Sequence, residues 1–340
     1  MGIYMGRLSI DIYFSCICKV GTIAMNILKI LKPINLEEEQ KKFVNSNSYN
    51  PIFKYEWTGR SVDDWLSKQS QQKYIPLVNA VRVQDYQRIG EEGEKIFSTK
   101  MDSDILQKAE EIIRKSRKQL KSQSIEDLVN AYKDAFVFFD IDYEIRLSDE
   151  RGFAVRPSHS NRVLLINKHL NLTYDSYQGI TRHEILHIIR SINTEHNGIE
   201  KSEFYLPTEE GLASYVQNVK ATEENYSLFQ HASRYLATNI SLHGTFRDVV
   251  NYLKKIGIED GLAFRRAVRH KSGFIDTAQP GDTMKSSMYF YNLQKVSQLS
   301  DSEKLRLFVG KIAIEDLPKY AEYRGKIDRD KIIDYFNLSV

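Results

Sequence analysis

The chain has 340 residues, of which 41% are hydrophobic and 27% are charged, so global disorder is excluded and one large domain or two can form. A formal net charge of +3 is too mild to indicate nucleic-acid binding, and we expect no nucleic-acid partner. Cys16 and Cys18 have no further cysteines to pair with as a disulfide framework or a zinc site, so we interpret them as reduced thiols, which favours a cytoplasmic location.

The first part of the chain predicts an extension followed by helices. Residues 8–30 are fairly apolar, but Asp11 and Lys19 interrupt them, so we expect no membrane span. We expect residues 1–24 to be an extension that contributes little to catalysis and residues 25–140 to form a mainly helical part. The expected helices cover residues 36–44, 103–121 and 124–139, the last with Ser124 and Asp127 in a variant of the capping box.

Three short segments rich in strand-forming residues come next. They cover residues 143–147, 152–156 and 163–167. We expect a small sheet here, and an edge strand such as 152–156 offers backbone hydrogen bonds to an extended peptide. The sequence therefore predicts an α+β fold in which residues 141–340 form the catalytic part.

The most informative motif follows these strands. His183, Glu184 and His187 form an H-E-x-x-H pattern, and on a helix positions i and i+4 lie one above the other, so both imidazoles can bind one metal ion. Glu184 stands where a carboxylate can take a proton from metal-bound water. The alternative is an amphipathic helix with two solvated histidines.

Isoleucines around the motif follow helical spacing and support the first interpretation. Their stripe points nearly opposite the two histidines, so one face of the helix can anchor in the core while the other faces a cleft. Ser176 is the expected N-cap. The stripe consists of Ile185, Ile188, Ile189 and Ile192.

A catalytic zinc ion needs a third protein ligand. Position 193, which the metzincin pattern would fill with His, is Asn193, and the spacing of His196 fits no motif. Pro207 and Thr208 read as a helix start, which places Glu209 and Glu210 on the first turn of a second helix. Acidic residues favour helix N-termini in any case, so this position alone does not establish a ligand.

The run Glu210-Gly211-Leu212-Ala213-Ser214-Tyr215 resembles the second zinc-binding segment of the gluzincin aminopeptidases. Residues 35–43, 49–57, 183–193 and 209–213 resemble the QEGLA-motif proteins, which include the microtubule-associated tyrosine carboxypeptidases. The resemblance extends over roughly residues 35–291 and is specific only in these segments. It implies a zincin-like fold, a zinc cofactor held by His183, His187 and Glu210, and a substrate that is a peptide or protein C-terminal tail, with an acidic tail and an aromatic last residue as its expected features.

Two departures set this chain apart from that family. The family often has one more residue between the two histidines, and Glu209 replaces its usual Gln. The shorter spacing makes the metal assignment easier, because i, i+4 geometry needs no helix bulge, but it weakens inference about the substrate. We expect Glu209→Ala to have little effect on zinc affinity.

Two later segments offer further site residues. Five basic side chains lie within residues 265–271, and an arginine there can hold a substrate carboxylate through two parallel hydrogen bonds, although a solvated basic face is an equal alternative. From this run we select Arg266 and Arg269 as substrate-binding residues. Residues 284–291 resemble a family segment of Lys followed by Tyr. That resemblance implies Lys285 as a substrate-binding residue and Tyr289 as the hydroxyl that stabilises the oxyanion. We interpret His231 and His243 as structural.

The sequence therefore predicts a zinc metallopeptidase, most simply a carboxypeptidase, in which Glu184 is the general base. An endopeptidase with the same metal site is the alternative among enzymes. A binding protein that keeps zinc without catalysis is the alternative of another class, and Glu184 speaks against it because a structural site needs no general base.

Overall fold

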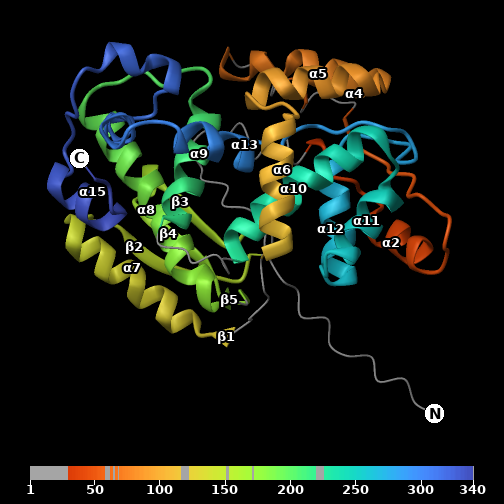
Figure 1. The fold of residues 1–340 in the computed structure, drawn as a ribbon, viewed down its shortest axis with the longest axis horizontal. Coiled ribbons are helices and arrows are strands. Elements are labelled where there is room, and N and C mark those ends of the chain that lie inside the picture. Colours follow the sequence, from red (N-terminus) through yellow and green to blue (C-terminus); the bar gives the residue numbers. More distant parts are fainter. Residues whose placement is uncertain are drawn as a thin grey trace.

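A computed structural model describes residues 30–57, 62–63, 66–67, 69–115, 122–150, 153–170, 172–219 and 226–339. The expected extension at residues 1–24, with both cysteines, lies outside these ranges. Within them the chain is α+β, as predicted, with many helices and a small sheet (Figure 1). None of the helices in the described ranges is both long and apolar enough to cross a membrane.

The helices before the sheet match their local sequence signals. Helix α2 covers Leu36–Val44, as expected, and α7 covers Ile125–Phe139. The side chain of Ser124 accepts the backbone N–H of Asp127, and Asp127 reciprocates, which confirms the capping box. Among the described residues, α4 (Ile75–Val83), α5 (Tyr86–Phe97) and α6 (Ser103–Lys115) also precede α7. Residues 116–121 of the helix expected after Ser103 lie outside the described ranges.

The sheet consists of β2 (Glu144–Ser148), β3 (Val155–Ser158) and β4 (Val163–Asn167) in the order β2-β4-β3. Strand β4 pairs in parallel with β2 and antiparallel with β3, so β3 is an edge strand. β4 has the expected bounds, whereas β3 begins at Val155 rather than at residue 152, because its register is set by pairing with β4. A second pair, β1 (Ser122–Gln123) with β5 (Leu172–Thr173), was not expected.

Two long helices follow, and both begin earlier than expected. Helix α8 covers Tyr174–His196, so Ser176 lies inside the helix and is not its N-cap. Helix α9 covers Tyr205–Asn218, so the expected start at Pro207 is wrong. A proline fits within the first turn because the N–H groups there have no partner inside the helix. Glu209 and Glu210 therefore lie beyond the first turn, where attraction to the helix N-terminus does not explain them.

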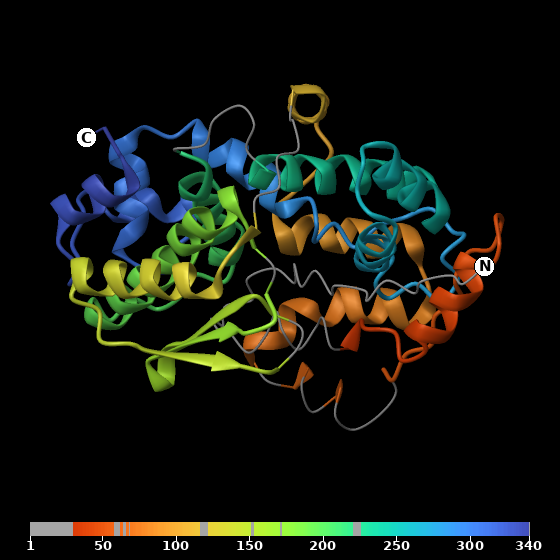
Figure 2. The ribbon, with the colours of Figure 1, turned by 90° about the horizontal axis from the view of Figure 1, so that it is seen from below.

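The remainder is mainly helical, as expected, with a non-helical segment at residues 271–287. Its helices are α10 (Tyr226–His243), α11 (Phe246–Lys255), α12 (Asp260–His270), α13 (Met288–Ser297), α14 (Asp301–Arg306) and α15 (Arg329–Phe336). Helix α6 packs on α10 at the periphery (Figure 2).

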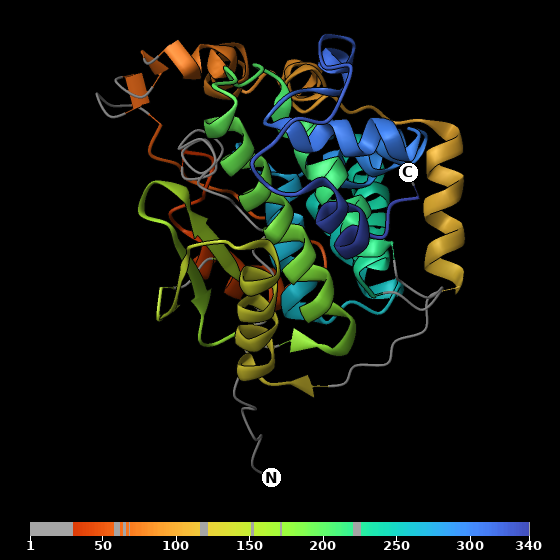
Figure 3. The same ribbon diagram turned by 90° about the vertical axis from the view of Figure 1, so that its left-hand side faces the viewer.

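Helix α8 is the centre of the largest apolar core. Ile185, Ile188 and Ile189 pack with side chains from α7, the sheet, α9 and the C-terminal segment. Figure 3 shows α8 with the sheet on one side and C-terminal helices on the other. Other clusters join α4 and α5 to Phe274 and Tyr289, and α2 to α11 and α12, so core packing links segments before and after residue 140.

Helices α9 and α13 cross in close contact at Gly211. A Cβ atom there would lie 2.7 Å from the Cβ of Asn292 and 2.8 Å from its carbonyl carbon. Such an approach is too close for any side chain, so the glycine of the Glu-Gly-Leu-Ala run is required by packing. This contact places α13 beside the helix that carries Glu210.

Candidate metal centre and active site

His183 and His187 on α8 converge with Glu210 on α9. One ligand atom from each residue lies within 4.8 Å of the others, and all three side chains are buried. Nε2 of His183 is 3.5 Å from Oε2 of Glu210. Two donors on one tetrahedral ion with bonds near 2.0–2.1 Å would be about 3.4 Å apart, so this spacing suits a shared metal. The structure brings together the three residues that the sequence selects as ligands.

Two of these atoms are buried without a hydrogen-bond partner. Within the described residues, Nε2 of His183 and Oε2 of Glu210 make no hydrogen bond. Leaving a buried polar group unsatisfied costs about 1–3 kcal/mol, and more for a charged group. A metal ion between these atoms would remove that cost. The donor set therefore could hold a metal ion.

Each histidine is oriented through its other ring nitrogen by a residue of α9. Nδ1 of His183 lies 3.1 Å from Oε1 of Gln217, and Nδ1 of His187 lies 2.7 Å from Oε1 of Glu209. An oxygen acceptor at Nδ1 places the ring hydrogen there, which leaves Nε2 as the coordinating nitrogen. Gln217 and Glu209 are therefore positioning residues for the two histidines.

Glu209 is itself held by a buried cation. Lys311 donates from Nζ to Oε1 of Glu209 over 3.0 Å, and both side chains are buried. Burial alone would raise the pKa of Glu209, but Lys311 and His187 hold it well below its usual value. Glu209 is an anionic acceptor for His187, so the expectation that it has little influence on the metal does not suit this geometry.

Arg190 fixes the position of Lys311. Its guanidinium donates from Nε to the carbonyl of Gly310 over 2.9 Å and from Nη2 to that of Ile312 over 2.8 Å. The backbone N–H of Lys311 donates to Oγ1 of Thr194, also on α8. The C-terminal segment is thus fastened to the helix that carries both histidines. A chain of contacts runs from Arg190 through Lys311 and Glu209 to His187.

Glu184, the expected general base, is fully buried on α8 next to His183. His196, considered as a third ligand, is exposed at the end of α8 and does not belong to the metal-ligand group. The chain therefore combines a three-donor centre with a buried carboxylate that follows the first histidine in sequence, and metal-assisted hydrolysis requires these groups.

The predicted substrate-binding cations come from two segments. Arg266 and Arg269 share one face of α12, since they are three residues apart. Arg269 and Lys285 both line a small cavity whose other lining residues are Leu31, Leu77, Phe97, Ser272, Thr283 and Ser286. Burial and the neighbouring Arg269 lower the pKa of Lys285 to about 7 against the opposing influence of Glu210. Glu210, a predicted metal ligand, therefore acts electrostatically on Lys285.

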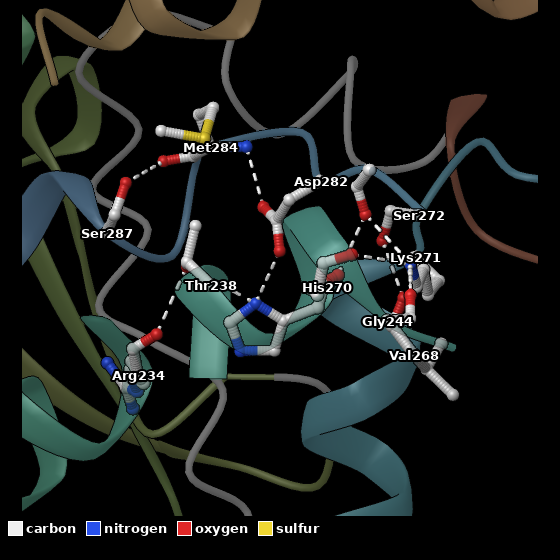
Figure 4. Close-up of polar contacts among 12 residues, drawn as sticks. Arg234, Thr238, Gly244, Val268, His270, Lys271, Ser272, Asp282, Met284 and Ser287 are labelled. Carbon is white, nitrogen blue, oxygen red and sulfur yellow. Dashed lines mark hydrogen bonds and ion pairs between the residues drawn. The ribbon is translucent and has the colours of Figure 1, made fainter. Parts of the chain in front are cut away.

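Lys271, from the same basic run, serves the fold instead. It is fully buried and donates to four backbone carbonyls over 2.8–2.9 Å. These carbonyls belong to Ser241, Gly244, Gln279 and Gly281, and Figure 4 shows the lysine among its neighbours. The basic run thus includes a lysine that organises the loop before α13 and Arg269, which lines the same small cavity as Lys285.

A buried pair beside Lys271 supports the segment that carries Lys285 (Figure 4). Nδ1 of His270 lies 2.8 Å from Oδ2 of Asp282, and Oδ1 of Asp282 accepts the backbone N–H of Met284 over 2.7 Å. Met284 has a φ of +62°, which is uncommon for a side chain larger than glycine. The pair therefore helps to hold a left-handed residue immediately before Lys285.

Tyr289, predicted to stabilise the oxyanion, is buried on α13 with its ring stacked on His231 of α10, at 5.8 Å between centroids and 16° between planes. The guanidinium carbon of Arg234 lies 5.7 Å from the centre of the same ring. His231, interpreted as structural, and Arg234, which the sequence did not indicate, therefore both lie beside a predicted site residue. The sequence signal for this arrangement was the three-residue spacing of His231 and Arg234, which places both side chains on one face of a helix.

The comparisons with known proteins agree with the family resemblance. The chain is 25% identical over 327 residues to microtubule-associated tyrosine carboxypeptidase 1 of Mus musculus, covering 90% of this chain and 64% of that protein. It is 23% identical over 314 residues to the putative tyrosine carboxypeptidase MATCAP2 of Mus musculus, covering 87% of this chain and 56% of that protein. The chain thus spans less than two thirds of each relative. No protein-family model matches it. The predicted resemblance to the microtubule-associated tyrosine carboxypeptidases is confirmed.

Proposed function

We propose that this chain is a zinc-dependent metallopeptidase of gluzincin type with a zincin-like fold, and that it removes the C-terminal residue of a peptide or protein. The observation that carries the proposal is the convergence of His183, His187 and Glu210, and Glu184, which follows His183 in sequence, is buried as well. The small sheet beside α8 supports the fold assignment, and the names of the two mouse relatives support a carboxypeptidase.

The chemistry can be assigned to named residues. His183, His187 and Glu210 would hold a zinc ion, which supplies a Lewis acid that activates water and polarises the scissile carbonyl. Glu184 takes the proton of the attacking water and later delivers it to the leaving amine. Gln217 and Glu209 keep the histidine rings in place, so the ligand geometry is set before substrate binds.

We assign the substrate from the positive charge of the predicted binding residues. Arg266, Arg269 and Lys285 would bind the carboxylate of a C-terminal tail, and a tail with acidic residues would be attracted by the same cations. Tyr289 would stabilise the oxyanion from α13. The names of the relatives make tyrosine the first residue to test at the C-terminus. We place this activity in the cytoplasm, on the basis of the cysteine usage and of the name of one mouse relative, which is called microtubule-associated.

A peptide screen read by mass spectrometry tests the proposal. Purified protein is incubated with peptides that end in tyrosine or another residue, each as free acid and as amide, with and without a chelator followed by added zinc. We expect loss of one C-terminal residue from free-acid peptides, abolished by the chelator and restored by zinc. Equal cleavage of acid and amide peptides would support the endopeptidase alternative, and a metal-free reaction would reject the zinc assignment.

A further inference from the structure

A cavity lies between α7, α8 and α15, the three helices on the left of Figure 1. Its volume is about 330 Å³, at the lower end of the range of about 300–1,000 Å³ that small-molecule sites occupy. None of the predicted metal ligands is among the described residues that line it. The lining includes Phe138 from α7, Gln178, Thr181 and Arg182 from α8, and Asp334 and Tyr335 from α15.

Arg182 brings a positive charge to this cavity without a counter-ion. The side chain is partly buried, and it makes no hydrogen bond or ion pair with another described residue. Burial lowers the pKa of Arg182 against the opposing influence of Tyr335, but a guanidinium remains charged in proteins. Withdrawing an ionic group from water is unfavourable unless a partner offsets the loss. A carboxylate in the cavity would provide that partner and would match the planar guanidinium.

Tyr335 lines the same cavity and adds a hydrogen-bond donor. Burial raises the pKa of its hydroxyl to about 12, so this group stays protonated at neutral pH. In the part of the chain that the structure describes, the hydroxyl makes no hydrogen bond. A carboxylate between α8 and α15 can therefore accept from both Arg182 and Tyr335.

Asp334 adds the opposite charge. Its side chain is exposed, and no ion pair joins it to Arg182 or to any other described residue. The cavity also has an aromatic wall, because the ring centroids of Phe138 and Tyr335 are 5.9 Å apart with 33° between the ring planes. A ligand that carries a carboxylate, an ammonium group and an apolar ring would therefore find a complementary group for each part.

We propose that this cavity binds a free amino acid with an aromatic side chain. Arg182 and Tyr335 bind its α-carboxylate, Asp334 binds its α-ammonium group, and its ring packs against Phe138. The site is additional to the proposed peptidase function and does not depend on it. Arg182 directly precedes His183 in α8, but successive residues of a helix point about 100° apart, so the two side chains serve different sites.

Calorimetric titration of the full chain with four probes tests the proposal. L-phenylalanine carries all three groups, whereas 3-phenylpropionate lacks the ammonium group, 2-phenylethylamine lacks the carboxylate and L-alanine lacks the ring. We expect L-phenylalanine to bind most tightly. Loss of the carboxylate should weaken binding by about 10- to 100-fold, because its partner Arg182 is partly buried. Loss of the ammonium group should weaken binding only about two- to fivefold, because Asp334 is exposed.

Matched variants assign each charge of the ligand to one residue. Arg182→Gln should weaken L-phenylalanine by about 10- to 100-fold and leave the affinity for 2-phenylethylamine unchanged. Asp334→Asn should weaken L-phenylalanine about two- to fivefold and leave 3-phenylpropionate unchanged. Arg88→Gln is the control, because Arg88 is an exposed arginine of α5 that does not line the cavity, and it should bind like the parent. If Arg182→Gln does not fold, Arg182→Lys keeps the charge and should lose only part of the affinity.

Three results would overturn the site. They are a parent protein that does not bind L-phenylalanine, a folded Arg182 variant with parental affinity for it, and equal parental affinities for L-phenylalanine and 3-phenylpropionate. None of these titrations involves peptide cleavage. Failure of the amino-acid site is therefore distinguishable from failure of the proposed peptidase function.

Discussion

Oε1 of Glu209 lies 2.7 Å from Nδ1 of His187 and 3.0 Å from Nζ of Lys311, with all three groups buried. One carboxylate oxygen thus orients a predicted metal ligand and neutralises a lysine from the C-terminal segment. Glu209 stands where related proteins usually have Gln, and a neutral amide there would leave the lysine without its anion. The charge of Glu209 therefore supports the burial of Lys311 in this chain.

Glu209→Gln tests this dependence. The amide oxygen can still accept from His187, so metal binding should persist, but the buried Lys311 loses its counter-charge and unfolding free energy should fall by about 3–5 kcal/mol. The double variant with Lys311→Met should recover most of that loss. Chemical unfolding of the single and double variants measures it, and additive losses would show that the pair is not coupled.

Arg190 should influence the metal from a distance. Arg190→Lys keeps a charge but cannot donate to the carbonyls of Gly310 and Ile312 in the same geometry, so Lys311 and with it Glu209 should shift. We expect zinc affinity to fall about 10-fold, as for other residues that orient ligands. Competition with a chelator measures this, and unchanged affinity in a folded variant would break the proposed chain of contacts.

Lys285 provides a pH test of substrate binding. Its pKa of about 7 lies far below the usual value of about 10.4 for lysine, so it loses its charge as pH rises through 7. KM for free-acid peptides should therefore rise by up to about tenfold per pH unit above 7, and a bound metal ion would move this rise to lower pH. Lys285→Arg stays charged and should remove the pH dependence. The same rise in KM in this variant would exclude Lys285 as its source.

Lys271 should matter for stability rather than for substrate. Lys271→Met removes a buried donor that four backbone carbonyls share, and unfolding free energy should fall by at least about 3 kcal/mol. Thermal and chemical unfolding measure this change. Folded protein at low temperature should keep its KM, and a selective rise in KM without loss of stability would instead place Lys271 at the site.

Local signals predicted much of the fold. The capping residues of α7, the helical pattern of α2 and the bounds of β4 depend on neighbours in sequence, and they were found where expected. Likewise, the i, i+4 histidines of α8 and the Glu-Gly pair of α9 identified three residues that the structure brings together. These features need no knowledge of distant contacts.

Other features depend on which helices meet. The roles of Lys271 and Lys285 differ although both are lysines of one segment, because one reaches four carbonyls and the other lines a cavity with Arg269. His231 lies beside a predicted site residue only because α10 and α13 meet, which brings its ring onto that of Tyr289, 58 positions away. The start of α9 was misplaced because Pro207 is compatible with any position in a first turn.

The Glu184→Gln variant tests the central claim most directly. Glutamine keeps the size of the side chain and removes only the proton acceptor, so both variant and parent should contain about one zinc per chain. Release of the C-terminal residue should fall by about 10²- to 10⁴-fold in the variant. Metal analysis of both proteins alongside peptide turnover gives the comparison. A zinc-loaded Glu184→Gln protein with parental turnover would contradict the account.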